Sequence, residues 1–386
     1  MNSLDNYLIA QIASYLPSPL DTPLRAVSAR FRAIIGPPKK RLPNKLMSHG
    51  AKIGCTEICE LARSRGAINY KKMLDIAARG NYFPILHLAF KWHAINIRKS
   101  HSVIDMQPNC DLLLMGAARG GHRALCERAF SQGARDFDRM LGAAARGGHR
   151  ALCELARSKG ASDFNYMLYG GARGGHRAIC DLAREWGATD YEGMLRGAAR
   201  GSHRDLCILA RDLGATDYNE MLVSAAHGDH RAICELAWIW GAINYDQALA
   251  CAAEGGHRAI CELARSWGAT NYNWMLVCAA GGGHPDLCIL AHEWGATDYD
   301  SMLIAAAESG YRAICELAHE WGATNFNGML IVATMSRRYD LCTLAFRWGA
   351  TNYNDMIGIA LSLHYLELVY LAQSCVFTPG MIVQGQ

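Results

Sequence analysis

The chain has 386 residues, of which 51% are hydrophobic and 19% are charged, which is enough for several average domains or for one long repeat array. Its net charge of +4 is too small to indicate nucleic-acid or membrane binding by itself. The sequence shows no apolar run of bilayer length, no basic N-terminal start and no small-residue cleavage site. We therefore expect a folded intracellular protein in the cytoplasm, with no membrane partner.

Residues 1–36 do not repeat, and their pattern predicts two short helices. Leu4, Leu8, Ile12 and Leu16 fall on one helical stripe, which ends at a proline. The second helix follows a Thr-Pro start, which is typical of an N-cap and first helical position. Two such helices are too small to fold well alone, so we expect them to pack on the rest of the chain or on another protein. A stiff basic linker, residues 37–46, follows.

The N-terminal segment resembles an F-box. The match lies at Leu4, Leu8, Ile9, Ile12, Tyr15, Leu16, Pro17, Leu24, Val27, Ser28, Arg30, Phe31 and Arg32. The resemblance implies docking on the Skp adaptor of an SCF ubiquitin ligase. The implied contacts are Leu8, Ile9, Ile12, Leu16, Leu24 and Val27. The alternative interpretation is a pair of helices that only caps the open end of the following domain.

Residues 47–375 repeat with a period of 27 residues. A fixed period of this size predicts a solenoid. We expect an all-α solenoid of about twelve stacked helix-turn-helix units, with atypical outer units as caps and a tail over residues 376–386. An insert over residues 95–112 interrupts the period once. The 27-residue period is marked by nine cysteines: Cys126, Cys153, Cys180, Cys207, Cys234, Cys261, Cys288, Cys315 and Cys342.

Each unit reads as two short helices. In "HRAICDLAREW", Ile179, Cys180 and Leu182 lie on one face, and the i, i+4 pair Arg177 and Asp181 lies on the opposite face. The preceding helix is rich in alanine and glycine, which allows close packing. Neither helix can bury its apolar face alone, so stacking is required. We interpret the regularly spaced cysteines as reduced, buried, small apolar side chains rather than a disulfide framework.

The unit resembles an ankyrin repeat. Leu195, Ala198, Ala199 and His203 keep the spacing of that family's motif. The period is shorter than the usual ~33 residues, and the missing residues fall where the family's β-hairpin finger stands. The resemblance implies a groove that binds a target protein. An F-box-like segment joined to ankyrin-like repeats resembles proteins of large DNA viruses that redirect host ubiquitination.

A histidine precedes the core cysteine by four residues in seven consecutive units. A metal site would need two further ligands each time, and a catalytic pair would need a third orienting group. Neither recurs, so the pattern favours a histidine that bonds between turns beside a core cysteine. We expect no enzyme activity, no metal and no cofactor.

The residue at one equivalent position of the repeat, the end of the first helix, changes along the array. It is arginine in the early units, and in later units it is His227, Glu254, Gly281 and Glu308. This predicts either a solvated edge or an electrostatic surface for an acidic partner, with nucleic acid as the less favoured ligand. We assign the target-binding groove to Arg119, Arg146, Arg173, Arg200, Tyr166, Tyr169, Arg196, Glu220 and Trp274.

Overall fold

The computed structural model describes residues 43–377, apart from 65–66, 68 and 101–107. Over these ranges it contains 24 helices, which form twelve successive pairs, and no strand. The expected all-α repeat array is confirmed. None of the described helices is long and apolar enough to cross a membrane. The F-box-like segment, with Leu8, Ile9, Ile12, Leu16, Leu24 and Val27, lies outside the described residues.

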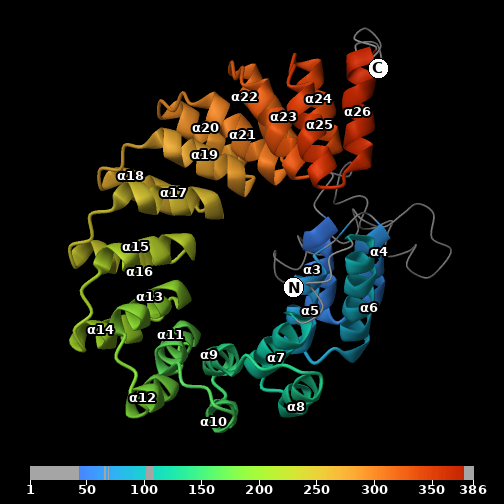
Figure 1. Cartoon of the computed structure of the whole chain (residues 1–386). Coiled ribbons are helices and arrows are strands. Elements are labelled where there is room, and N and C mark those ends of the chain that lie inside the picture. Colours follow the sequence, from blue (N-terminus) through green and yellow to red (C-terminus); the bar gives the residue numbers. More distant parts are fainter. Residues whose placement is uncertain (1–42, 65–66, 68, 101–107, 378–386) are drawn as a thin grey trace, which may run out of the picture. The chain divides into compact units, whose positions relative to one another are not determined.

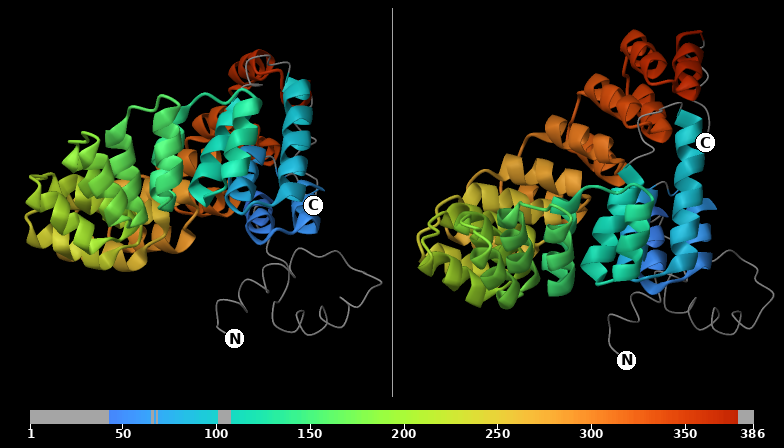
Figure 2. Two further views of the ribbon diagram at one scale, coloured as in Figure 1. Left: turned by 90° about the horizontal axis from the view of Figure 1, so that it is seen from below. Right: turned by 60° about the horizontal axis from the view of Figure 1, so that its bottom comes forward.

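The array divides into two compact units, at Asp190 and Tyr191. In the first unit, α5, α7, α9 and α11 each pack on the next, and the second helix of each pair lies beside the first, on the outer side of this row (Figure 1). Figure 2 shows these helices from two other sides. The helices are α3 (Pro43–Ile53), α4 (Thr56–Ser64), α5 (Tyr70–Arg79), α6 (Phe83–Ser100), α7 (Pro108–Gly120), α8 (Arg123–Ser131), α9 (Phe137–Gly147), α10 (Arg150–Ser158), α11 (Phe164–Gly174) and α12 (Arg177–Glu185).

The second unit repeats the same arrangement, with the first helices from α13 to α25 packed in one row. Its helices are α13 (Tyr191–Gly201), α14 (Arg204–Asp212), α15 (Tyr218–His227), α16 (Arg231–Ile239), α17 (Tyr245–Gly255), α18 (Arg258–Ser266), α19 (Tyr272–Gly282), α20 (Pro285–Glu293), α21 (Tyr299–Ser309), α22 (Arg312–Glu320), α23 (Phe326–Met335), α24 (Tyr339–Arg347), α25 (Tyr353–Ser362) and α26 (Leu366–Phe377).

The core of each pair is built from the apolar residues that recur in every repeat. In α9 and α10, Met140, Leu141, Cys153 and Ala156 are all 0% exposed. Cysteine and alanine therefore serve as small core side chains, as the sequence predicts.

Glycines bring some first helices unusually close. A Cβ atom at Gly170 of α11 would lie 2.4 Å from the carbonyl oxygen of Gly142 in α9.

The turn between the two helices of a pair depends on glycine and histidine. Gly148 ends α9 in the left-handed region, with φ of 79°. The Nε2 atom of His149 then lies 3.2 Å from the carbonyl oxygen of Arg119, at the end of α7. His122, His230, His257 and His284 contact the preceding pair in the same way. The interpretation of this column as a histidine that bonds between turns is confirmed.

A second connection links successive pairs. The Oδ1 atom of Asp138 accepts hydrogen bonds from the backbone N–H groups of Ser162, at 2.7 Å, and Asp163, at 2.9 Å. Asp163 in turn caps α11, since its side chain accepts from the N–H of Tyr166. This inter-repeat hydrogen-bond pair recurs at Asp111, Asn165, Glu192, Asn219, Asp246, Asn273, Asp300 and Asn327.

The insert at 95–112 is absorbed largely by helix. Its first residues extend α6 to 18 residues, where the second helix of other pairs typically has nine. Its last residues begin α7 at Pro108. Lys71 stands at the position of the inter-repeat hydrogen-bond pair, and a lysine side chain has no acceptor. The regular connection is therefore interrupted beside the insert.

Asp138→Ala is expected to lower the free energy of unfolding by about 1–2 kcal/mol, because two backbone N–H groups lose their acceptor. Asp138→Asn should lose much less, since asparagine occupies the same position in four other pairs. Urea denaturation followed by circular dichroism measures both. Equal losses in the two variants would show that the charge, rather than the acceptor, matters.

Candidate functional site

A hollow of about 90 Å³ lies on the first helices of four consecutive pairs in the first unit. It brings together Arg119, Arg146, Arg173, Tyr166 and Tyr169, all predicted as target-binding residues. We call it the arginine hollow. Its lining is Asp75 from α5, Met115 and Arg119 from α7, Gly142, Ala143 and Arg146 from α9, and Tyr166, Tyr169, Gly170 and Arg173 from α11.

The guanidinium groups in the arginine hollow lie close enough to repel one another. Burial, followed by the charges of Arg119 and Arg173, lowers the pKa of Arg146 to about 10. The pKa of Arg119 is lowered by burial and then by the charge of Arg79. With Asp75, these groups make four guanidiniums and one carboxylate, a net charge of +3.

Only Arg79 at the edge of the hollow has a carboxylate partner, which is Asp75, four residues earlier. Among the described residues, no carboxylate lies within ion-pair distance of Arg119, Arg146 or Arg173. The Nε atom of Arg173 is buried without a hydrogen-bond partner in this part of the chain. On the outer helices of the same pairs, arginines are paired instead: Arg123 with Glu127 and Arg150 with Glu154, both at 2.9 Å. Arg119, Arg146 and Arg173 therefore have no ion-pair partner among the residues that the structure describes, and the single carboxylate of the hollow, Asp75, offsets only part of their charge.

Two tyrosines form one wall of the hollow. The rings of Tyr166 and Tyr169 stack with centroids 6.3 Å apart and planes 9° apart. A Cβ atom at Gly142 would lie 2.3 Å from the ring of Tyr166, so glycine leaves the space that this ring occupies. The hydroxyl of Tyr169 accepts a hydrogen bond from Arg173 at 3.3 Å. These contacts hold the aromatic pair beside the arginines.

Folding does not require arginine at these positions. Basic side chains at a helix C-terminus complement the helix dipole, which is a purely structural role. Yet the equivalent position is Glu254 in α17, Gly281 in α19 and Glu308 in α21, and those helices have the same length as α9 and α11. Something other than helix formation therefore accounts for the basic cluster.

The remaining predicted groove residues belong to the second unit. Arg196 and Arg200 lie on α13, Glu220 on α15 and Trp274 on α19. Burial raises the pKa of the Cys251 thiol, Glu254 and Glu220 raise it further, and Arg200 opposes them. Glu220, Glu254 and Arg200 therefore all lie near the Cys251 thiol. Trp274 is 41% exposed.

The repeated cysteines are buried thiols of low reactivity. Burial raises the pKa of Cys153, Cys180 and Cys207 to about 12, so these thiols are protonated at neutral pH. Within the described ranges, no group of three or more His, Cys, Asp or Glu side chains is placed to hold a metal ion. The cysteine column therefore has the properties of core packing.

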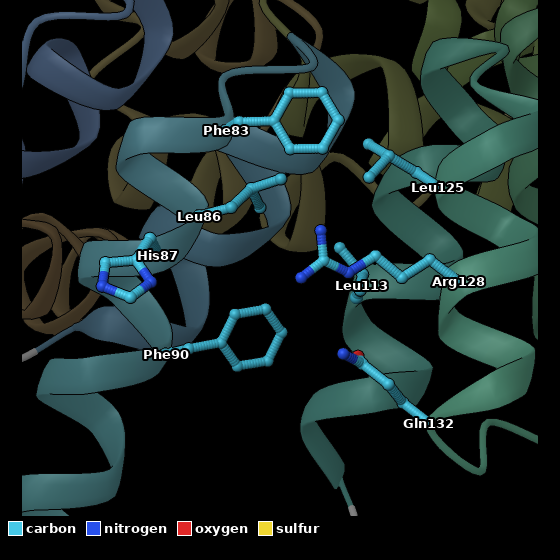
Figure 3. Close-up of a pocket in the computed structure, with 8 residues that line it drawn as sticks. All are labelled: Phe83, Leu86, His87, Phe90, Leu113, Leu125, Arg128 and Gln132. Atoms are coloured by element: carbon cyan, nitrogen blue, oxygen red, sulfur yellow. The ribbon is translucent and has the colours of Figure 1, made fainter.

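An apolar cleft of about 430 Å³ lies beside the insert, between α6 and α8 (Figure 3). Leu113 forms its floor, Phe83 and Phe90 line it from α6, and Leu125 lines it from α8. The side chain of Arg128 extends across it toward α6. Its lining contains one arginine, Arg128, and so lacks the concentrated charge of the arginine hollow.

The sequence matches no protein-family model and no curated protein. The site is therefore argued from its own geometry. Sequence reasoning found the arginine column and both tyrosines but missed Asp75. The i, i+4 spacing of Asp75 and Arg79 was the signal that could have identified it.

Native protein treated with a thiol reagent at neutral pH should label Cys55 and Cys110, which are half-buried, before the core cysteines. Cys153, Cys180 and Cys207 should stay unlabelled until denaturant is added, because thiolate is the reactive form. Mass spectrometry of digested samples measures this. One core cysteine that reacts much faster than its equivalents would indicate an activated nucleophile instead.

Proposed function

We propose that the chain is a protein-interaction scaffold, because helical repeat architectures typically present extended surfaces built from equivalent positions. Here the framework columns repeat while the groove positions vary. Variation at exposed positions of an otherwise constant framework is the pattern expected where a binding surface is encoded.

We propose that the chain is a non-catalytic adaptor whose first compact unit, the part of the array up to Asp190, binds an acidic segment of a target protein. The observation that carries this proposal is the arginine hollow, where three guanidinium groups lack a carboxylate partner. Their mutual repulsion costs stability in the free protein, and an anionic ligand would relieve it. The tyrosine wall adds rigid contact area of the kind that is enriched at interfaces.

Within this proposal, residues 1–36 recruit the Skp adaptor of an SCF ubiquitin ligase, so that the bound target is ubiquitinated. The support is the F-box-like pattern of apolar residues in the sequence. The quiet chemistry of the core cysteines supports an adaptor that leaves catalysis to the ligase. An origin in a large DNA virus fits the combination of the two modules.

A degenerate pool of glutamate-rich fluorescent peptides should bind the full-length protein, with affinity that falls as salt rises. Arg146→Gln should weaken binding by roughly tenfold, because a charge-assisted hydrogen bond is lost. Arg150→Gln removes the same charge from the outer face and is the matched control. Fluorescence anisotropy measures both. Equal affinities for the two variants would remove the hollow as the binding site.

Full-length protein should bind a eukaryotic Skp adaptor with micromolar or tighter affinity, as measured by calorimetric titration. Leu8→Asp/Ile12→Asp should abolish binding, because charge on the apolar stripe prevents docking. The repeat array of that variant should melt as the parent does. Absence of binding by intact, folded protein would exclude the F-box function and favour a scaffold whose N-terminal helices act as a cap.

A further inference from the structure

Three arginines that lack an ion-pair partner in the described part of the first unit converge on one small hollow rather than spreading along the groove. Arg119, Arg146 and Arg173 come from the first helices of three consecutive pairs, α7, α9 and α11, yet line the same 90 Å³ space. Arg79, on the first helix of the preceding pair, is already paired with Asp75. The free positive charge is therefore concentrated at one point, which constrains the chemistry of the ligand.

We infer that the arginine hollow binds a phosphate monoester on a side chain of the target protein. This inference rests on the proposed function and narrows it, because it names one phosphorylated residue as the central contact of the acidic segment. The ligand class is a phosphorylated serine, threonine or tyrosine.

Charge and donor number favour phosphate over carboxylate. A carboxylate carries one negative charge, and a single bidentate arginine can satisfy its two oxygens. A phosphate monoester carries about −1.5 to −2 at neutral pH and has three strong acceptor oxygens. The hollow and its edge hold a net charge of +3, with three arginines free of carboxylates. One carboxylate would leave most of this charge unneutralised, whereas one phosphate would neutralise most of it.

Size and the state of the tyrosines also favour a single phosphorylated side chain over a nucleic-acid strand. The hollow is several times the ~10–15 Å³ that one water needs, which is room for an oxyanion of a few heavy atoms. Single-stranded nucleic acid is bound by a continuous basic track and by aromatic rings that are free to stack on bases. Here Tyr166 is stacked on Tyr169 and packed against Gly142, and Tyr169 is bonded to Arg173.

The test compares two degenerate fluorescent peptide pools that differ only at the centre, phosphoserine in one and glutamate in the other. Full-length protein should bind the phosphoserine pool roughly tenfold more tightly. Arg146→Gln should remove this preference, whereas Arg150→Gln, a charge-matched change outside the hollow, should keep it. Lowering the pH through about 6 should weaken binding of the phosphoserine pool only, because its second phosphate proton is gained there.

The other outcomes separate the two proposals. Equal binding of both pools, lost in Arg146→Gln, would overturn the phosphate inference and leave the acidic-target proposal standing. Binding of neither pool by folded protein would overturn both. A single-stranded oligonucleotide that binds more tightly than either pool, and that is also lost in Arg146→Gln, would identify a nucleic-acid site and overturn both. Unchanged circular dichroism of Arg146→Gln confirms that the variant is folded, and Arg173→Gln provides a second variant in the same hollow.

Discussion

The repeat array depends on a side-chain acceptor near the start of the first helix, which in most pairs accepts hydrogen bonds from two backbone N–H groups of the loop that opens the next pair. Asp138 does this for Ser162 and Asp163, and aspartate, asparagine or glutamate does it in the other pairs. Only an acceptor is required, so these residue types exchange freely. This contact fixes the register of each pair against the next through a short loop. The histidine turn and the buried methionine, leucine and cysteine columns complete the framework.

A framework fixed at so few positions leaves the ends of the first helices free to change. Arginine, glutamate and glycine all occur at one position without altering the helix that bears them. The clustering of Arg119, Arg146 and Arg173 opposes stability, because like charges repel at partly buried sites. Local conflicts with folding of this kind are expected at functional sites. On the outer face of the same pairs, Arg123 and Arg150 each have a glutamate partner, in contrast to the three arginines that share the hollow.

The two halves of the proposed adaptor rest on different kinds of support. The target surface is argued from contacts, burial and charge in the first repeat unit. The recruitment segment is argued from sequence pattern alone. Neither half uses the cysteines, whose regular recurrence with histidine is explained by packing and turn contacts. The recurring histidine and cysteine pattern is therefore structural in this protein, and the proposed binding surface uses the columns that fail to repeat.

The sequence by itself determined the all-helical class, the twelve pairs, the core cysteine column and the histidine turn, because each is a local pattern repeated at a fixed period. It also contained the aspartate and asparagine column, but the acceptor role became evident only when residues 24 and 25 positions apart were placed side by side. Tertiary structure alone decided that Arg119, Arg146 and Arg173 share one hollow, that Tyr166 stacks on Tyr169, and that the insert lengthens α6. These features depend on how closely neighbouring helices approach, which glycines such as Gly142 and Gly170 set through contacts between pairs.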